Sequence, residues 1–309
     1  MTPERGVPLA PHTSLRVGGP VDYFVLARSA GEMVEALRWA ADQHIEARVI
    51  GGGSNLLVAD AGVAGLVVKT GFVRANVDSR HGGPVLVAEA GANLANLARR
   101  MAKQDLGGLE WAANVPGTVG GAAVNNAGAF GGDTASSAVS VTTVDAEGIR
   151  TRLSVQDLEY GYRSSVLKRS ELVDVAVESV EWRLHTSAPG EADARVKEFN
   201  AQRMRSQPRI LSAGSVFANP PGTYSGKLIE DVGLKGATSG GAQISEQHAN
   251  FIVNPGHATA RDVYSLMRRA QNTVFEHAGV WLRAEIELVG RWTEEERTTL
   301  MGPLAMANG

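Results

Sequence analysis

The sequence contains no cysteine. This absence excludes disulfides, thiolate nucleophiles, iron–sulfur clusters and thiolate zinc sites. Excess charge is also small, because 30 basic residues stand against 33 acidic ones for a formal net charge of −3. Such a balance gives no overall attraction to nucleic acid or to an anionic membrane. The charges and prolines of residues 1–8 do not suit a secretory signal, and no stretch approaches a membrane span in length, so we expect a cytoplasmic protein.

Glycine is the residue in excess, with 36 positions among 309. The rest of the composition is ordinary, at 43% hydrophobic and 20% charged residues, and the length predicts about two folded domains. The glycines cluster at 51–53 and again within residues 107–132. Because glycine alone lacks a side chain, the backbone of these clusters is expected to approach something closely.

Local patterns predict a β-α-β unit in the first 70 residues and antiparallel sheet further on. A capping-box pattern at Ser29 and Glu32 opens the first helix, and Thr259 with Asp262 opens a long helix that ends at Gly279. Strands are expected at 21–27, 47–50, 66–68, 85–90 and 173–184, with a hairpin formed by 139–144 and 148–153. Helices are expected at 94–103 and 195–204, a linker at 187–190 and a closing strand at 281–289.

Two glycine loops are the first candidates for chemistry. Gly51-Gly52-Gly53 and Ser54 follow a predicted strand, where successive glycine N–H groups can converge on a phosphate. The run is neither GxGxxG nor a Walker A motif, so a tight strand-exit turn stays the alternative. A second glycine run at 116–122 is continued by residues 125–131. Paired loops fit a dinucleotide, with its two phosphates and ring system, better than a mononucleotide.

Three polar residues stand in separate contexts: Arg163 after the hairpin, Ser215 within residues 213–217, and Glu285 in the closing strand. Taken singly, Arg163 and Glu285 are typical of surface ion pairs, and Ser215 is typical of a turn. Ser215 lacks the GxSxG context of a hydrolase nucleophile. His248 fits a core histidine equally well, and no spacing is typical of a metal site, so we expect no metal.

Taken together, an ordered set of short segments resembles the UDP-N-acetylenolpyruvoylglucosamine reductases over about residues 12–290. The segments that carry the resemblance are residues 13–19, 51–57, 116–122, 126–131, 162–165, 207–208, 213–217, 219–220, 226–229, 233–236, 248–254 and 285–286. Each segment alone is unspecific, whereas the ordered set is specific.

The resemblance implies an α+β chain with the vanillyl-alcohol-oxidase or PCMH type of FAD-binding fold. Two α/β subdomains, at 1–71 and 72–207, would bind FAD, and a C-terminal α+β substrate-binding domain would occupy 208–290. A polar tail at 291–309 is expected to be loosely held. The short span from Arg163 to Pro189 implies the subtype without the long substrate loop.

The implied activity is reduction of the enolpyruvyl ether of UDP-N-acetylglucosamine to UDP-N-acetylmuramate, a peptidoglycan precursor. NADPH would reduce FAD and leave before the sugar nucleotide enters, and hydride would then pass from the flavin to the vinyl carbon. We expect noncovalent FAD, because there is no cysteine and neither glycine loop contains a histidine. The FAD-binding residues implied are Gly51, Gly52, Gly53, Ser54, Asn55, Leu56, Pro116, Gly117, Thr118, Gly120, Gly121, Ala122, Asn126, Gly128 and Arg203.

The same resemblance assigns roles to the three scattered residues. Hydride addition builds negative charge into an enolate beside a carboxylate, which requires a fixed cation, and Arg163 is implied for that role. Glu285 is implied as a catalytic acid that helps to hold the enolate, and Ser215 as the proton donor to carbon. Substrate binding is implied for Tyr162, Asn219, Lys227 and His248.

The chain departs from the family pattern without touching those three residues. Ala218 stands where a lysine is frequent, which removes one candidate substrate contact, and Phe130 stands where tyrosine is usual. Two alternatives stay open. One is an FAD oxidoreductase of the same fold acting on a different sugar or alcohol, and the other is a nucleotide-binding sensor without catalysis. We expect small-molecule partners, with no nucleic acid and no membrane.

Overall fold

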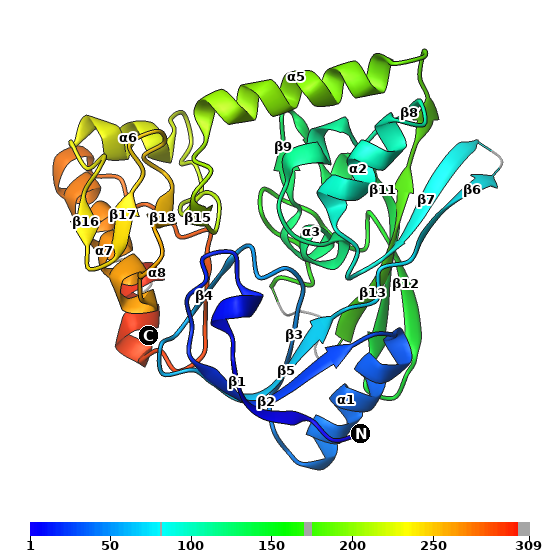
Figure 1. The fold of residues 1–309 in the computed structure, drawn as a ribbon, viewed down its shortest axis with the longest axis horizontal. Helices are drawn as coiled ribbons and strands as arrows, with labels where there is room; N and C mark the ends of the chain where they lie inside the picture. The colour runs from blue at the N-terminus through cyan, green and yellow to red at the C-terminus, as the bar shows by residue number, and fades with distance from the viewer. Residues whose placement is uncertain (81, 170–174, 302–309) are drawn as a thin grey trace. The chain divides into compact units, whose positions relative to one another are not determined.

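The computed structural model describes residues 1–80, 82–169 and 175–301, and it divides into two compact units (Figure 1). Unit 1 contains Met1–Glu4, Phe24–Gly52 and Gly65–Arg205. Unit 2 contains Arg5–Tyr23, Gly53–Ala64 and the described residues from Ser206 to Met301. Both units are therefore discontinuous in sequence, and the expected division at residues 71, 207 and 290 stays a prediction.

The predicted β-α-β unit is present. β3 (Ala47–Ile50) pairs in parallel with β5 (Val63–Thr70), and these strands belong to a sheet of order β1-β2-β5-β3 with β1 (Glu4–Pro8) and β2 (Pro20–Ala27). α1 (Ala30–Asp42) begins where the capping pattern predicted, with Ser29 Oγ accepting a hydrogen bond from the Glu32 N–H at 3.1 Å. The Glu32 carboxylate accepts from the Arg28 N–H at 2.8 Å rather than from the N–H of Ser29.

An antiparallel sheet of order β12-β11-β13-β7-β6 forms the main sheet of unit 1 (Figure 1). The predicted hairpin is confirmed, because Asp145 Oδ1 accepts from the Ile149 N–H at 2.8 Å across its turn. Trp182 lies on the third strand of the series and is fully buried. The first two residues of the strand expected at 173–184 lie outside the described residues. The bounds are β12 (Arg150–Ser154), β11 (Ala138–Asp145), β13 (Val175–Arg183), β7 (Gly83–Glu89) and β6 (Ala75–Arg80).

Helices and short strands complete unit 1. The predicted helix at 94–103 is α2 (Leu94–Ala102), and the helix expected at 195–204 is longer, as α5 (Glu191–Ser206). α5 starts directly after the expected linker, where the Gly190 N–H donates to Asp105 Oδ1 at 2.7 Å. The remaining elements are β8 (Leu106–Gly107), η2 (Glu110–Asn114), α3 (Val119–Asn125), β9 (Gly128–Ala129), β10 (Gly132–Asp133), α4 (Thr134–Ser137) and β14 (His185–Thr186).

Unit 2 is built on a small sheet of order β15-β18-β17-β16 and on α7 (Ala260–Ala278). Its core includes Phe217, Met267 and Leu282, which are at most 2% exposed. The described residues also form η1 (Ala10–His12), β4 (Leu56–Val58), β15 (Leu211–Ser212), α6 (Ser225–Asp231), β16 (Thr238–Ser239), β17 (Ala242–Ile244), β18 (Ile252–Asn254), β19 (Glu287–Val289) and α8 (Glu294–Met301).

The strand expected at 281–289 is present only as β19, so placing Glu285 within a strand was wrong. Ala284 makes a single antiparallel bridge with Phe217, after which the chain turns and β19 pairs in parallel with β4. Glu285 lies between these two pairings. The change of partner explains why one apolar sequence run does not form one strand.

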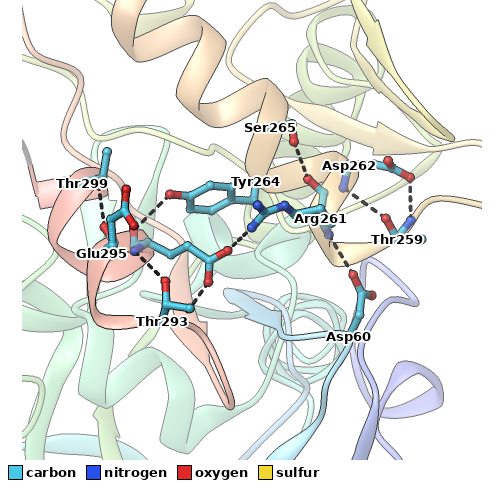
Figure 2. A network of polar contacts seen from close by, with 10 residues as sticks. Asp60, Thr259, Arg261, Asp262, Tyr264, Ser265, Thr293, Glu295 and Thr299 are labelled. Carbon is cyan, nitrogen blue, oxygen red and sulfur yellow. Dashed lines mark hydrogen bonds and ion pairs between the residues drawn. The ribbon is translucent and has the colours of Figure 1, made fainter.

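The residues after 290 are also more ordered than expected, because α8 packs against α7 through the polar network of Figure 2. Arg261 forms an ion pair with Glu296, the Tyr264 hydroxyl donates to the Glu296 carbonyl at 3.2 Å, and Leu300 is 5% exposed. At the start of α7, the Asp60 carboxylate accepts the N–H groups of Ala260 and Arg261 at 2.8 and 2.9 Å. The loosely held tail is therefore wrong for residues 291–301, and residues 302–309 lie outside the described part of the chain.

The α7 capping box is confirmed. Thr259 and Asp262 each accept a hydrogen bond from the other's N–H, and Gly279 closes the helix in the left-handed conformation. Within the described residues, every helix is too short or too polar to cross a membrane.

Candidate active site

The two glycine loops are in direct contact within unit 1. A Cβ added to Gly51, which follows β3, would lie 2.1 Å from Oγ1 of Thr118, which precedes α3. A Cβ on Gly52 would lie 3.1 Å from the Gly117 Cα. The close approach predicted from the glycine clusters is therefore made first of all between the loops themselves.

Hydrogen bonds hold the second loop in place. The N–H groups of Val119 and Gly120 donate to the carbonyls of Ala92 and Ala90, each at 2.9 Å. Thr118 Oγ1 accepts from the Gly121 N–H at 3.4 Å and caps α3. Residues 117–121 therefore form a rigid loop whose backbone position is set by the end of β7.

The next residues of the first loop, Gly53 to Leu56, belong to unit 2. Gly53 has φ +61°, and a Cβ there would lie 2.3 Å from the His12 carbonyl oxygen. The Asn55 side-chain amide donates to the Glu285 carbonyl at 3.0 Å, and the Asn55 carbonyl accepts from the Glu287 N–H at 2.9 Å. Asn55, which is itself expected to bind FAD, is thus hydrogen-bonded to the backbone of Glu285, the expected catalytic acid.

Arg163 is held against the loop that follows α3. Its guanidinium donates to the carbonyls of Asn126 and Gly128 at 3.3 and 3.0 Å and lies over the Tyr162 ring at 5.1 Å. Both Arg163 and Asn126 have left-handed backbone conformations, and the Asn126 amide donates to the Gly161 carbonyl at 2.9 Å. These contacts fix the plane of the guanidinium and join Arg163 and Tyr162 to two predicted FAD-binding residues.

Arg203, another predicted FAD-binding residue, lies on α5. Phe199, one turn earlier, stacks on Phe130 with ring centroids 4.6 Å apart, which anchors the helix to the 126–132 loop. Burial lowers the pKa of the Arg203 guanidinium. Since arginine stays protonated, Arg203 contributes a partly desolvated positive charge to unit 1.

Ser215 and Glu285 are connected through Val216, which follows Ser215 in the chain and is hydrogen-bonded to the Glu285 backbone. The Glu285 N–H donates to the Val216 carbonyl at 2.8 Å, and the Ala218 N–H donates to the Arg283 carbonyl at 2.9 Å. Val216 is 1% exposed, whereas Ser215 is half-buried. Two of the three residues expected to be catalytic therefore share one hydrogen-bonded cluster of unit 2.

The expected substrate-binding residues of unit 2 lie around α6. Asn219 Oδ1 accepts from the Ser225 N–H at 3.1 Å, and Lys227 Nζ pairs with Asp231 Oδ2 at 2.6 Å on an exposed face. A Cβ on Gly226 would lie 3.0 Å from the His248 ring, so His248 packs against the first turn of α6.

The His248 ring is hydrogen-bonded through one of its two nitrogens. Its Nδ1 accepts from the Asn250 N–H at 3.2 Å, an arrangement that leaves the ring proton on Nε2. Burial, followed by the nearby Lys235 charge, lowers the pKa of His248 below its ordinary value.

Sequence reasoning missed Asn250, a 3% exposed asparagine whose side chain contacts the segment next to Ser215. The one available signal was a polar residue inside the apolar run 249–253. The described residues contain no group of three His, Asp or Glu side chains arranged to hold a metal ion.

The glycine loops fit the cofactor that the sequence implies. The missing side chains of Gly51 and Gly52 make room for Thr118 and Gly117, and the glycine backbone of the two loops carries no side chain that would keep a ring system or a diphosphate away. Arg203 supplies positive charge to the same unit.

Comparison with known proteins gives the relationship. Residues 21–154 match the model of an FAD binding domain, and residues 206–289 match that of the UDP-N-acetylenolpyruvoylglucosamine reductase C-terminal domain. UDP-N-acetylenolpyruvoylglucosamine reductase 2 of Symbiobacterium thermophilum is 42% identical over 93% of this chain and 92% of its own. The Synechococcus sp. (strain JA-3-3Ab) reductase is also 42% identical, over 94% of this chain and 92% of its own.

A solved structure gives the same answer for the fold. The UDP-N-acetylenolpyruvylglucosamine reductase (MurB) of Thermus caldophilus matches with a TM-score of 0.78 and 36% identity, covering 94% of this chain and 99% of that one. The α+β fold with an FAD-binding domain, expected from the sequence, is confirmed. On sequence, domain content and fold alike, the chain belongs to the UDP-N-acetylenolpyruvoylglucosamine reductase family.

Proposed function

We propose that this protein is an FAD-dependent reductase that uses NADPH to convert the enolpyruvyl ether of UDP-N-acetylglucosamine into UDP-N-acetylmuramate. The observation that carries the proposal is the hydrogen-bonded cluster in which Val216 joins Ser215 to Glu285. This cluster lies within the residues that match the reductase C-terminal domain. The contacting glycine loops support the FAD part of the proposal.

FAD, held by the 51–56 and 116–122 loops, would supply the chemistry of taking hydride from NADPH and giving it to the vinyl carbon. The protein must then stabilise the negative charge that spreads toward the substrate carboxylate. Arg163 suits this task because the Asn126 and Gly128 carbonyls fix its guanidinium before the substrate arrives. A preorganised cation needs little rearrangement as charge develops.

Proton delivery completes the reduction. We assign the proton at the enolate carbon to the Ser215 hydroxyl and the stabilisation of the enolate to Glu285. Serine is intrinsically a poor acid, so its position relative to the carbon has to be held closely. The Val216 hydrogen bonds provide that restraint for both residues at once.

The sugar nucleotide needs polar contacts at its diphosphate and sugar. Lys227 is 64% exposed in its ion pair with Asp231, and exposed pairs are worth only about 0–1 kcal/mol, so a phosphate can replace the carboxylate. Asn219, His248 and Tyr162 are the further contacts we assign to the substrate. The cytoplasmic location and the lack of nucleic-acid partners stay predictions from the sequence.

Stopped-flow absorbance of the flavin tests the proposal. NADPH is expected to bleach the bound flavin, and the enolpyruvyl sugar nucleotide to restore its colour. Reoxidation by some other sugar or alcohol, with none by this substrate, would instead identify a different oxidoreductase of the same fold. A flavin that NADPH leaves oxidised would contradict the choice of reductant.

Ser215→Ala tests the proton donor. We expect normal bleaching by NADPH and a loss of roughly 10² to 10⁴-fold in reoxidation, because the substitution removes one oxygen and little volume. Ser265→Ala is the matched control, since Ser265 Oγ donates to the Arg261 carbonyl of its own helix and makes no other hydrogen bond to a described residue. Reoxidation of Ser215→Ala within about threefold of wild type would remove Ser215 from the mechanism.

A further inference from the structure

The segment 216–218 is hydrogen-bonded on two sides. On one side it contacts residues 283–285, through the Glu285 N–H to the Val216 carbonyl and the Ala218 N–H to the Arg283 carbonyl. On the other side it contacts Asn250, whose carbonyl accepts from the Val216 N–H at 2.9 Å. The segment is therefore hydrogen-bonded like a short central strand of a sheet. Only some of its hydrogen-bond partners are backbone groups, however.

The Asn250 side chain supplies the missing pairing. Its Oδ1 accepts from the Phe217 N–H at 2.9 Å, and its Nδ2 donates to the Phe217 carbonyl at 2.8 Å. The planar carboxamide thus stands in for a peptide group of a neighbouring strand. Hydrophobic side chains of the same size cannot do this, because they offer neither a donor nor an acceptor.

The environment makes this pairing effective. Asn250 is 3% exposed and Phe217 is 2% exposed, so water does not compete for either bond. The Asn250 N–H itself donates to His248 Nδ1 at 3.2 Å, which also fixes the backbone of this residue. A buried pair of this kind restrains the peptide of Phe217 in both position and orientation.

Two residues of the proposed mechanism depend on that peptide. Ser215 precedes Val216 directly, and the Glu285 N–H donates a hydrogen bond to the Val216 carbonyl. A shift of the 216–217 backbone would therefore displace the proton donor and the enolate-stabilising acid together. Displacements of about 1 Å in such groups cost on the order of 10²-fold in rate.

We propose that Asn250 is a positioning residue for the proton-delivery step, which holds Ser215 and Glu285 in register through the two side-chain hydrogen bonds to Phe217. This inference rests on the proposed function, because it assigns Asn250 to the second half-reaction. A residue that only supports the fold would weaken both half-reactions alike, through loss of stability or of bound FAD.

The chain offers a matched control in Asn254. It is also 3% exposed, and within the described residues its side chain also bonds to backbone groups: the Leu15 carbonyl at 2.8 Å and the N–H groups of Gly256 and Ala258 at 2.8 and 3.0 Å. None of these contacts involves residues 215–218 or 283–285. Asn254→Ala therefore reproduces the loss of a buried carboxamide without touching the cluster.

The experiment compares Asn250→Ala with Asn254→Ala in the FAD-loaded protein. Stopped-flow absorbance measures bleaching by NADPH and reoxidation by the enolpyruvyl sugar nucleotide, and thermal unfolding measures stability. For Asn250→Ala we expect reoxidation to fall by roughly 10- to 100-fold, with bleaching within about twofold of wild type. For Asn254→Ala we expect a similar loss of stability with the ratio of the two rates unchanged.

A second variant guards against misfolding. Asn250→Asp keeps an acceptor for the Phe217 N–H, and its second oxygen can donate to the Phe217 carbonyl only when the carboxyl group is protonated. Its reoxidation rate is therefore expected to lie between those of Asn250→Ala and wild type at a pH low enough to protonate the buried carboxyl group. Equal slowing of both half-reactions by either Asn250 variant, or the same split in Asn254→Ala, would overturn the positioning role. If wild-type flavin is not reoxidised by this substrate, the proposed function itself fails and the Asn250 assignment falls with it.

Discussion

Gly51→Ala is the sharpest test of the contact between the glycine loops. The new methyl group would lie 2.1 Å from Thr118 Oγ1, where ordinary contact begins at 3.4 Å. Rotation of the Thr118 side chain would move Oγ1 away from the methyl group, but it would also break the hydrogen bond that Oγ1 accepts from the Gly121 N–H at the start of α3. The loops must therefore separate, or Thr118 must leave its position as the cap of α3.

Both outcomes can be given a magnitude. Loss of a threonine cap costs about 1 kcal/mol, and overpacking of a close contact costs about 1–3 kcal/mol. Since either outcome relieves the clash, we expect the free energy of unfolding of the Gly51→Ala protein to fall by about 1–3 kcal/mol. With about 2–4 °C per kcal/mol for domains of this size, Tm would fall by roughly 2–12 °C. Separation of Gly52 from Gly117 would also weaken FAD binding by about tenfold or more, equivalent to about 1.4 kcal/mol.

Calorimetry of the FAD-free protein and fluorescence titration with FAD measure the two effects separately. Gly31→Ala is the control, because its Cβ would meet no atom closer than Ser29 Oγ at 3.7 Å and the site lies in the first turn of α1. Alanine there favours the helix by about 0.5–1 kcal/mol, so its Tm is expected to rise slightly with FAD affinity unchanged. A Gly51→Ala protein as stable as wild type, with the same FAD affinity, would refute the reasoning.

Three further predictions follow from the site. Arg163→Lys is expected to slow flavin reoxidation by about 10²-fold and bleaching by NADPH much less, because a lysine cannot hold the planar geometry fixed by Asn126 and Gly128; equal slowing of both rates would assign Arg163 to the fold alone. The pKa of His248 is lowered by burial and by Lys235, so His248 binds a proton more readily in the unfolded chain than in the folded protein. The stability that His248 contributes is therefore present above about pH 6.5, its ordinary pKa, and is lost as the pH falls through the lower pKa of the folded state. Tm measured against pH should show this loss in wild type and a smaller one in His248→Gln, and parallel curves would contradict it. Acid precipitation is expected to release all flavin into the supernatant, and colour retained in the pellet would show a covalent link.

Local signals predicted the elements that local interactions form. The Thr259 and Asp262 capping box marked the start of α7 correctly, because both partners lie within one helical turn. The 139–153 hairpin was correct for the same reason. The closing strand was too long in prediction, since its pairing switches from Phe217 to β4, and no pattern within residues 281–289 indicates a change of partner.

Contacts between distant segments account for most of what the sequence could not predict. α8 was missed because its attachment depends on Arg261 and Tyr264, more than thirty residues earlier. The glycine loops were identified as candidates, but their contact depends on the fold. Asn250 escaped notice because an asparagine within an apolar run has no local partner to suggest its role, which arises only when Phe217 is placed beside it. The roles of Arg163, Ser215 and Glu285 stay predictions.

The parallel pairing of β4 with β19 has a consequence for synthesis of the chain. Leu56–Val58 leaves the ribosome early, whereas its partner Glu287–Val289 is among the last of the described segments to be made. During that interval Leu57, which is completely buried in the finished protein, has no strand to cover it. Unpaired apolar strands invite association between nascent chains. Nascent chains stalled before residue 287 are therefore expected to bind chaperones more strongly, and to resist proteolysis less, than chains stalled well beyond residue 289.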